Sequence, residues 1–232
     1  MRKRCLEEWW DVAEKFGAKW NFHHACSALD GKHIAIKAPR NSGTVYHNYK
    51  GFFSIILMGL VDADYNFLWA QVIANGSTSD CAVFNASPLR EVLENGDIGF
   101  PDVEPLPNDD LNIPYFFVGD DAFPLRTWMM KPFSHRNMKN DERIFNYRLS
   151  QVHRIMENGF GILAKRFPCL LTTMLQEPDT VKVIVMACLC LHNLIRLRYP
   201  GLQNLDLDRE GKDHEVIQGA WRNAASGAQS DP

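Results

Sequence analysis

The stretch Pro114-Tyr-Phe-Phe-Val-Gly-Asp-Asp-Ala-Phe-Pro-Leu-Arg126 decides how the rest of the chain is interpreted. Its aromatic and β-branched run, Tyr115 to Val118, predicts a buried strand. The run stops at Gly119 and is followed by two consecutive carboxylates, Asp120 and Asp121. Sites in open α/β sheets lie at the carboxyl ends of strands, so this position favours a functional role. Aspartate is also a common turn and helix-capping residue, and from this stretch alone that structural explanation stays open.

Upstream of this stretch, hydrophobic periodicity predicts one helix followed by several strands. Apolar residues at helical spacing over residues 3–20 predict an amphipathic helix. The strands expected next, in chain order, are 26–30, 33–36, 52–61 and 67–74. Asp30 and Gly31 are interpreted as a turn between the first two strands. Turn chemistry at 62–66 predicts that the last two strands pair as an antiparallel hairpin.

Between the strand 67–74 and the central stretch, proline and glycine residues divide the chain into short segments. A helix that begins near Asp80 is expected to break at Pro88. The polar segment 97–114 contains several prolines and is expected to be an irregular loop. After the paired aspartates, residues 126–132 are expected to form a short helix.

Two longer helices complete the predicted order. Apolar residues at steps of three and four predict a helix over 141–167, and a strongly apolar helix is expected over 180–198. Glu157 falls on the polar flank of the first of these helices. A purely structural explanation of Glu157 is an exposed ion pair with Arg154, which would stabilise the helix by at most about half a kcal/mol. Strands followed by helices favour an α/β fold whose first three strands are antiparallel.

Charge is distributed unevenly along the 232 residues, although the net charge is only -3. Between Pro124 and Arg166 there are nine Lys or Arg residues against three acids, a local excess of six positive charges. A basic zone on an otherwise acidic protein is typical of a face that contacts phosphates. A solvated helix has a similar composition, so this observation carries modest weight.

The sequence gives no indication of secretion, of a zinc site or of a membrane span. Its six cysteines are scattered, without a C-x-x-C pair. Cys188 and His192 share a helix face, but the apolar run around them favours buried core over a metal site. The N-terminus lacks the apolar region of a signal peptide, and the longest apolar run, about 183–191, is too short to span a bilayer. We therefore expect a reducing, intracellular location and no membrane partner.

Three carboxylates occupy positions compatible with one shared site. Asp30 follows the first predicted strand, Asp120 follows the strand 115–118, and Glu157 lies on the late helix. Convergent carboxylates suit Mg²⁺, which prefers hard oxygen ligands and keeps positions open for water and phosphate oxygens. Two such ions about 3.5–4 Å apart can activate a nucleophile and stabilise the leaving oxygen of a phosphodiester.

Five motifs occur in the same order as in a known family. They are Ala28-Leu-Asp-Gly-Lys-His-Ile34, Tyr49-Lys-Gly51 leading into Phe53-Ser-Ile55, Asn75-Gly-Ser-Thr-Ser-Asp80, Val118-Gly-Asp-Asp-Ala-Phe-Pro-Leu125, and Phe145-Asn-Tyr-Arg-Leu-Ser150 continuing to Glu157-Asn-Gly-Phe-Gly-Ile-Leu163. In these residues the chain resembles the PIF/Harbinger type of DDE transposase and the nucleases derived from it. Each motif alone is weak, but five in order, between about residues 26 and 196, are specific.

The resemblance implies an RNase H-like fold that cuts and joins DNA with Mg²⁺ or Mn²⁺. On this basis residues 26–200 are expected to form the nuclease domain. Residues 1–25 would form an amphipathic helix and linker, and the polar segment 201–232 a disordered tail. Relatives usually carry an N-terminal helix-turn-helix region, so this chain is expected to be a fragment or a shortened, domesticated copy.

The resemblance also assigns the acids. Asp30, Asp120 and Glu157 match the acidic triad of the family and are expected to be metal ligands. Asp62, which also follows a buried strand, is the second-ranked candidate for the first acid. Asp80 matches a further family acid, although a helix N-cap explains it equally well. Asp121 is given no catalytic role.

DNA is the partner that the resemblance implies, with a separate DNA-binding protein and an oligomer left open. The expected location is the nucleus, with the cytoplasm as an alternative. The candidate phosphate contacts are Lys50, Arg126, Arg143, Arg148 and Arg154. Two other functions remain open: a domesticated protein that binds DNA or protein without catalysis, and an enzyme that acts on RNA–DNA hybrids.

Overall fold

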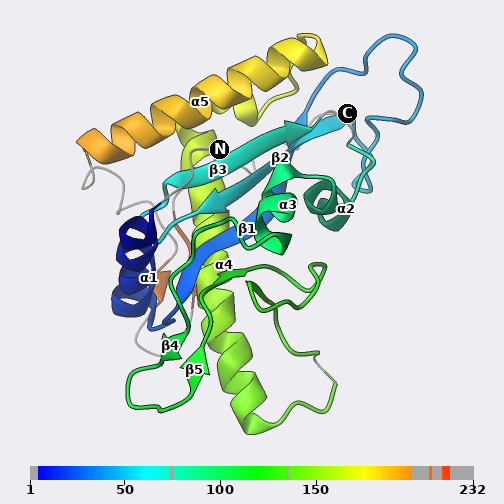
Figure 1. The fold of residues 1–232 in the computed structure, drawn as a ribbon. Helices are drawn as coiled ribbons and strands as arrows, with labels where there is room; N and C mark the ends of the chain where they lie inside the picture. Colours follow the sequence, from blue (N-terminus) through cyan, green and yellow to red (C-terminus); the bar gives the residue numbers. More distant parts are fainter. Residues whose placement is uncertain (1–4, 74–75, 135, 200–208, 211–215, 220–232) are drawn as a thin grey trace. The chain divides into compact units, whose positions relative to one another are not determined.

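A five-stranded mixed sheet forms the centre of the fold (Figure 1). The computed structural model describes residues 5–73, 76–134, 136–199, 209–210 and 216–219. The strand order is β3-β2-β1-β6-β7. Their bounds are β1 (Ala25–Ala35), β2 (Ser54–Val61), β3 (Phe67–Ile73), β6 (Phe116–Val118) and β7 (Met129–Met130). With helices beside the sheet, the chain is the α/β protein that its sequence predicts.

The first three strands form an antiparallel meander. The Ser27 hydroxyl donates to the Val61 carbonyl at 2.8 Å, whereas the Ile36 amide donates to the Phe53 carbonyl at 2.9 Å. Between these two contacts the residue number increases along β1 and decreases along β2, so the two strands run in opposite directions. A tight turn, closed by the Asp62 amide on the Asn66 carbonyl at 3.0 Å, then leads into β3.

The last two strands extend the sheet in parallel. β1 pairs with β6 so that Ala28 lies opposite Val118, and β6 pairs with β7 so that Val118 lies opposite Met130. This half of the sheet is parallel and the meander is antiparallel, which makes the sheet mixed.

The chain divides into two compact units that share several elements. The first comprises Met1–Asp30, Gly59–Trp69 and Asp80–Met156, and the second comprises Gly31–Met58, Ala70–Ser79 and Glu157–Pro232. Helix α4 (Asn140–Arg166) is continuous through the boundary between Met156 and Glu157.

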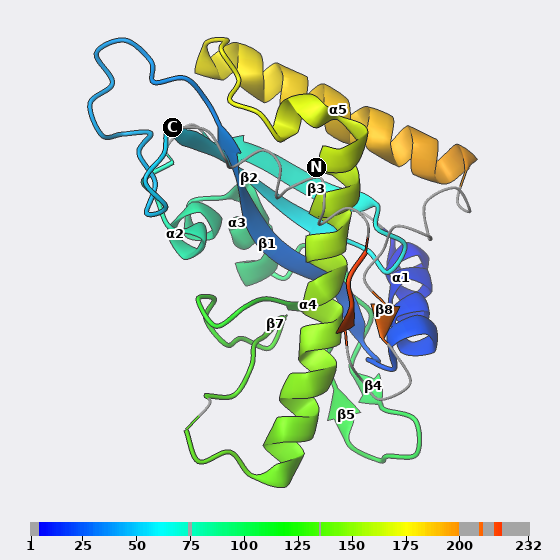
Figure 2. The same cartoon turned by 180° about the vertical axis from the view of Figure 1, so that it is seen from behind.

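In the first unit, helices lie on opposite faces of β6. Trp9 of α1 (Leu6–Trp20) packs against Phe117 with ring centroids 5.7 Å apart. Phe22 packs against Phe116 at 5.9 Å and against Phe145 of α4 at 6.0 Å. Successive strand residues point to opposite faces, so α1 covers one side of β6 and the first half of α4 covers the other (Figure 2).

Short elements occupy the rest of the first unit. α2 (Asp80–Asn85) is followed by α3 (Pro88–Glu94), and Ser87 caps α3 by accepting from the Arg90 amide at 3.2 Å. The break at Pro88 was predicted. The segment 97–114 is irregular apart from the two-residue pair β4 (Glu104–Pro105) and β5 (Asn112–Ile113).

The second unit contains the end of α4, the short helix η1 (Pro168–Leu170) and α5 (Pro178–Arg198). A two-residue pair, β8 (Arg209–Glu210) with β9 (Val216–Ile217), lies in the segment expected to be a disordered tail. Gln218 and Gly219 follow β9, and the remainder of that segment lies outside the described residues.

Helix α5 is, within the described part of the chain, the one helix long and apolar enough to cross a membrane by length and composition. About a third of its most apolar window is buried, and core helices of soluble proteins meet the same criterion. Because α5 extends from Pro178 to Arg198, the apolar run 183–191 is the middle of a longer helix.

Two sequence-based expectations about local structure are wrong. Asp30 and Gly31 do not form a turn, because β1 continues to Ala35 and merges the two predicted strands. Residues 126–132 do not form a helix. The Trp128 and Met130 carbonyls instead accept from the Phe117 and Gly119 amides at 2.9 Å each. An isolated helix this short is unstable, and strand pairing satisfies the same backbone groups.

Candidate functional site

Asp30 and Asp120 lie at matching positions on neighbouring parallel strands. The register places Ala28 opposite Val118, and the Gly119 amide donates to the Met130 carbonyl at 2.9 Å, so the extended backbone continues past Val118. Two residues further along each strand are the two aspartates. Adjacent strands are about 4.8 Å apart, so the register puts the two residues at equivalent positions on neighbouring strands.

Both aspartates point to the face of the sheet that α4 covers. Asp120 shares its face with Phe116, which contacts the residues beneath α4. The Asp30 carboxylate lies 4.0 Å from Nε2 of His153, which belongs to α4. In the first unit, Asp30 and Asp120 therefore lie on the same face of the sheet, and His153 of α4 lies next to Asp30.

Asp120 also forms the turn that its sequence context suggested. Its Oδ1 accepts from the Ala122 amide at 2.9 Å, and its other oxygen accepts no hydrogen bond from the described residues. Its neighbour Asp121 is different. That side chain is 82% exposed, and its carboxylate lies 3.3 Å from Nζ of Lys131. Asp120 thus combines a turn role with an available oxygen, whereas Asp121 forms a surface ion pair.

His153 is the member of this cluster that the sequence did not single out. Its Nε2 faces Asp30, while its Nδ1 is buried without a hydrogen-bond partner among the described residues. A signal was present in the sequence, because His153 precedes Glu157 by four residues and so shares its helix face. That spacing became informative only once α4 was placed beside β1.

Glu157 lies one turn beyond His153 on α4 and is half-buried. The rise along a helix puts it about 6 Å from His153 in the axial direction. Glu157 is the first residue of the second unit, whereas Asp30 and Asp120 belong to the first. The cluster in the first unit thus has two of the three predicted acids.

Asp62 is held in a structural turn. Its Oδ1 accepts from the amides of Asp64 at 2.8 Å and Asn66 at 2.9 Å, and its Oδ2 accepts from the Asn66 side chain at 3.0 Å. Burial raises the pKa of the Asp62 carboxyl, and these hydrogen bonds oppose that rise. Because Val61 lies beside Ser27, Asp62 is level with Cys26, four residues or about 13 Å along β1 from Asp30.

Asp80 is the first residue of α2, in the first unit. Asp80 is therefore one position inside the helix rather than its N-cap, where an acid interacts favourably with the helix dipole. Its match to a further acid of the resembled family stays a prediction.

The donor set of the first unit fits a magnesium-type ion only partly. No group of three or more His, Cys, Asp or Glu side chains within the described part of the chain is arranged to hold a metal. Asp30 and Asp120 supply hard carboxylate oxygens, of which at least one on Asp120 is available. Mg²⁺ is often held by one or two carboxylates and keeps several waters, so two such residues suit it better than they suit zinc.

Cys188 and His192, considered as metal ligands and rejected from the sequence, are both buried in α5. Arg166 donates to the His192 carbonyl at 3.3 Å, and burial lowers the pKa of that guanidinium. Arg166 therefore has a structural role. Fewer cations are available to phosphates than the nine Lys and Arg residues counted between Pro124 and Arg166.

The predicted phosphate contacts differ in exposure. Arg143 and Arg148 are exposed on α4, Arg154 is half-buried, and Arg126 is exposed but lies 3.9 Å from the Glu94 carboxylate. Arg143 and Arg148 are thus the cations of this group best placed to contact an external ligand.

Lys50, the fifth candidate, lies in the second unit on a braced loop. The buried Asn48 accepts from the Lys50 amide at 2.9 Å and donates to the Ser54 hydroxyl at 2.9 Å. Beside it, Tyr49 is 83% exposed, with Lys50 Nζ 5.5 Å from its ring centroid. The motif Tyr49-Lys-Gly51 contains both residues, but the sequence does not indicate that the ring is exposed next to the cation.

Comparison with known proteins identifies the family. A model of the DDE superfamily endonuclease family matches residues 29–193, which include most of β1 and all of β6 and α4. The chain belongs to this family. The match contains Asp30, Asp120 and Glu157, and the Harbinger resemblance of the sequence motifs is confirmed by the relatives described next.

Two Harbinger transposase-derived relatives illustrate this DDE endonuclease family. The protein named "Putative nuclease HARBI1" from Homo sapiens is 30% identical over 169 residues, covering 72% of this chain and 44% of the relative. "Protein ALP1-like" from Arabidopsis thaliana is 27% identical over 191 residues, covering 80% of this chain and 46% of the relative. The chain spans less than half the length of these relatives. No solved structure matches the chain at a significant level.

Proposed function

We propose that this chain is the catalytic part of a divalent-metal-dependent DNA endonuclease with an RNase H-like arrangement of its site. The observation that carries the proposal is the parallel register of β1 with β6, because Asp30 and Asp120 each come two residues after the paired Ala28 and Val118. Membership of the DDE superfamily endonuclease family and similarity to a protein named as a nuclease support the same reaction.

In this proposal the three acids are metal ligands rather than proton shuttles. Asp30 and Asp120 would hold Mg²⁺ or Mn²⁺ from the sheet, and Glu157 would approach from α4 one turn beyond His153. When bound, such ions supply activation of the attacking oxygen and stabilisation of the leaving oxygen of a phosphodiester. His153 would orient the Asp30 carboxylate through Nε2 and limit the access of water from the helix side.

DNA would be held by the exposed cations and by Tyr49. Arg143 and Arg148 offer charge to phosphates, while the Tyr49 ring offers a face on which a base can stack beside Lys50. Base stacking is tolerant of sequence, so this arrangement suits a nuclease core whose target is chosen elsewhere.

The decisive experiment compares cleavage by acid variants with a matched neighbour. Purified protein with Mn²⁺ and duplex DNA should nick the DNA, and Asp120→Asn or Glu157→Gln should reduce the rate by about 100-fold or more, because each removes a ligand charge. The control is Asp121→Asn, which removes the adjacent exposed acid and should leave the rate unchanged. Full activity in both acid variants would reject the assignment.

The DNA-contacting role of α4 predicts a change in salt dependence. If Arg143 and Arg148 each neutralise a phosphate, replacing both with alanine should flatten the plot of log affinity against log salt concentration by about 2. Fluorescence anisotropy with a labelled duplex between about 50 and 200 mM salt measures the slope. An unchanged slope would place the nucleic acid on another surface.

A second function, DNA or protein binding without catalysis, is favoured by one observation. The described residues contain no group of three metal-binding side chains. Calorimetric titration with Mn²⁺ separates the two functions, because a nuclease of this type must bind the ion and a non-catalytic relative need not.

A further inference from the structure

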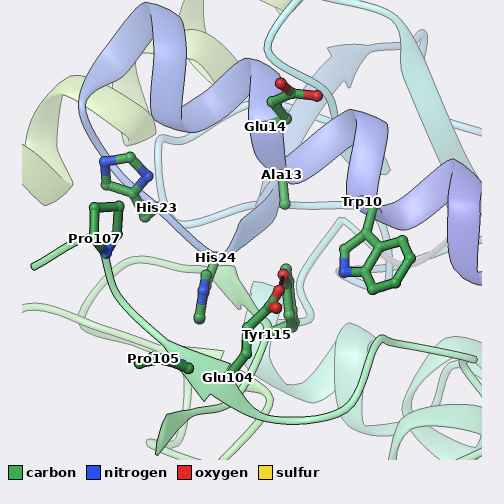
Figure 3. Close-up of a pocket in the computed structure, with 9 residues that line it drawn as sticks. All are labelled: Trp10, Ala13, Glu14, His23, His24, Glu104, Pro105, Pro107 and Tyr115. Atoms are coloured by element: carbon green, nitrogen blue, oxygen red, sulfur yellow. Dashed lines mark hydrogen bonds between the residues drawn. The ribbon is translucent and has the colours of Figure 1, made fainter. Parts of the chain in front are cut away.

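A pocket on the first unit lies between α1 and the β4–β5 pair and is separate from the paired aspartates (Figure 3). Its volume is about 510 Å³, within the range of ligand-binding pockets. Its walls are mostly flat rings and prolines: Trp10, His24, Pro105, Pro107 and Tyr115. None of its lining residues is a lysine or an arginine.

Two of these rings form a rigid stack. The imidazole of His24 lies against Tyr115 with centroids 4.4 Å apart and planes 15° from parallel. Nδ1 of His24 lies 3.1 Å from the Ile113 carbonyl, which fixes the orientation of the ring. Burial lowers the pKa of His24, so the imidazole is a neutral surface rather than a competing cation. The stack therefore presents aromatic faces without positive charge.

Glu104 supplies negative charge next to the rings. Tyr115 donates its hydroxyl to Oε1 of Glu104. In the described part of the chain no basic side chain forms an ion pair with Glu104, although it is only half-exposed. Figure 3 shows its carboxylate beside Tyr115, with Trp10 nearby on α1. A partly desolvated carboxylate without a counter-ion attracts a cation.

We propose that this pocket binds the side chain of an arginine from a partner polypeptide. A guanidinium is planar and weakly hydrated, so it stacks on aromatic faces and can donate two parallel hydrogen bonds to one carboxylate. Trp10, 46% exposed, provides the outer aromatic face, and cation–π attraction is strongest with tryptophan. The carboxylates of Glu104 and of Glu14 at the rim repel nucleic acid, which makes a protein the appropriate ligand.

The test uses two short peptides that differ only in charge. Acetyl-Gly-Arg-Gly-amide is compared with the same peptide carrying citrulline, which has nearly the same shape but is neutral. Binding to the full chain is followed by the indole N–H resonance of Trp10, assigned with Trp10→Phe. We expect the arginine peptide to bind at least about tenfold more tightly, since a charge-assisted contact contributes more than about 1.4 kcal/mol.

Variants connect the effect to the pocket. Glu104→Gln keeps an acceptor for the Tyr115 hydroxyl but removes the charge, so it should abolish the preference for arginine. Glu7→Gln, an equivalent change in the first turn of α1 outside the pocket, should keep it. Trp10→Leu, at a partly exposed position, should weaken arginine binding without unfolding the chain; because this variant lacks the indole, its binding is measured by calorimetry. Equal binding of the two peptides, no binding of either, or a preference that survives Glu104→Gln would overturn the proposal, whatever the outcome of the nuclease experiment.

Discussion

Asp62 and Asp120 both follow a buried strand of the same sheet, yet their surroundings are opposite. The backbone and side chain of Asn66 enclose Asp62, so that both of its oxygens accept hydrogen bonds. Asp120 accepts from the Ala122 amide with one oxygen, and its other oxygen accepts no hydrogen bond from the residues that the structure describes. The pattern of strand followed by aspartate thus has two structural outcomes, and the number of satisfied oxygens distinguishes them.

Position in the sheet explains the difference. β2 runs antiparallel to β1, so its carboxyl end, at Asp62, lies near the amino end of β1. β6 runs parallel to β1, so its carboxyl end, at Asp120, lies beside Asp30. Among these described strands, the parallel pair puts its two aspartates at equivalent positions. An acid after a strand therefore gains functional meaning from the direction of the neighbouring strand.

The largest expected effect is on metal affinity. Asp120→Asn and Asp30→Asn should each weaken Mn²⁺ binding by about 100-fold or more, because each removes a charged oxygen ligand. Asp62→Asn should change the affinity by less than about twofold, since its carboxylate is already occupied by donors. Isothermal titration calorimetry measures all three. A loss of binding in the Asp62 variant alone would reverse the comparison and make Asp62 the first acid.

The next effect is on the free energy of unfolding. Here the substitution of Asp62 should cost more than the substitution of Asp30, the reverse of the order expected for metal affinity. Asp62→Ala leaves the amides of Asp64 and Asn66 without their acceptor, so the free energy of unfolding should fall by about 2–3 kcal/mol. Asp30→Asn removes a charge next to a second carboxylate and should cost less than about 0.5 kcal/mol. Denaturant unfolding followed by tryptophan fluorescence compares them. Equal losses would mean that Asp30 is also a structural residue.

The smallest effect is the pH dependence that Asp62 gives to stability. Burial raises the pKa of its carboxyl above the unfolded value. A raised pKa in the folded state contributes stability that is complete below the unfolded pKa and is lost as pH rises through the folded pKa. The stability of the wild type relative to Asp62→Asn, which cannot titrate, should therefore be greatest in acid and decline as pH rises.

Unfolding curves of both proteins at several pH values measure this difference. A difference that stays constant with pH would show that the hydrogen bonds to the Asp62 carboxylate fully offset its burial.

The sequence predicted the elements with strong periodicity and missed those defined by tertiary pairing. The helix stripe containing Leu149, Val152 and Met156 is buried as expected, because a regular apolar pattern permits one structure. β7 was missed because two residues are too few to show a periodicity. They form a strand because they pair with β6. His153 was missed for the same reason, because its functional interpretation depends on its tertiary distance to Asp30.

The short strand β7 has a consequence for self-association. It is two residues long, and Pro132, two residues beyond its end, has no amide hydrogen to donate. An edge of this kind is a poor template for a further strand, natural or amyloid-like. If copies of this protein assemble, we therefore expect them to join through side-chain surfaces rather than by extending the sheet beyond β7.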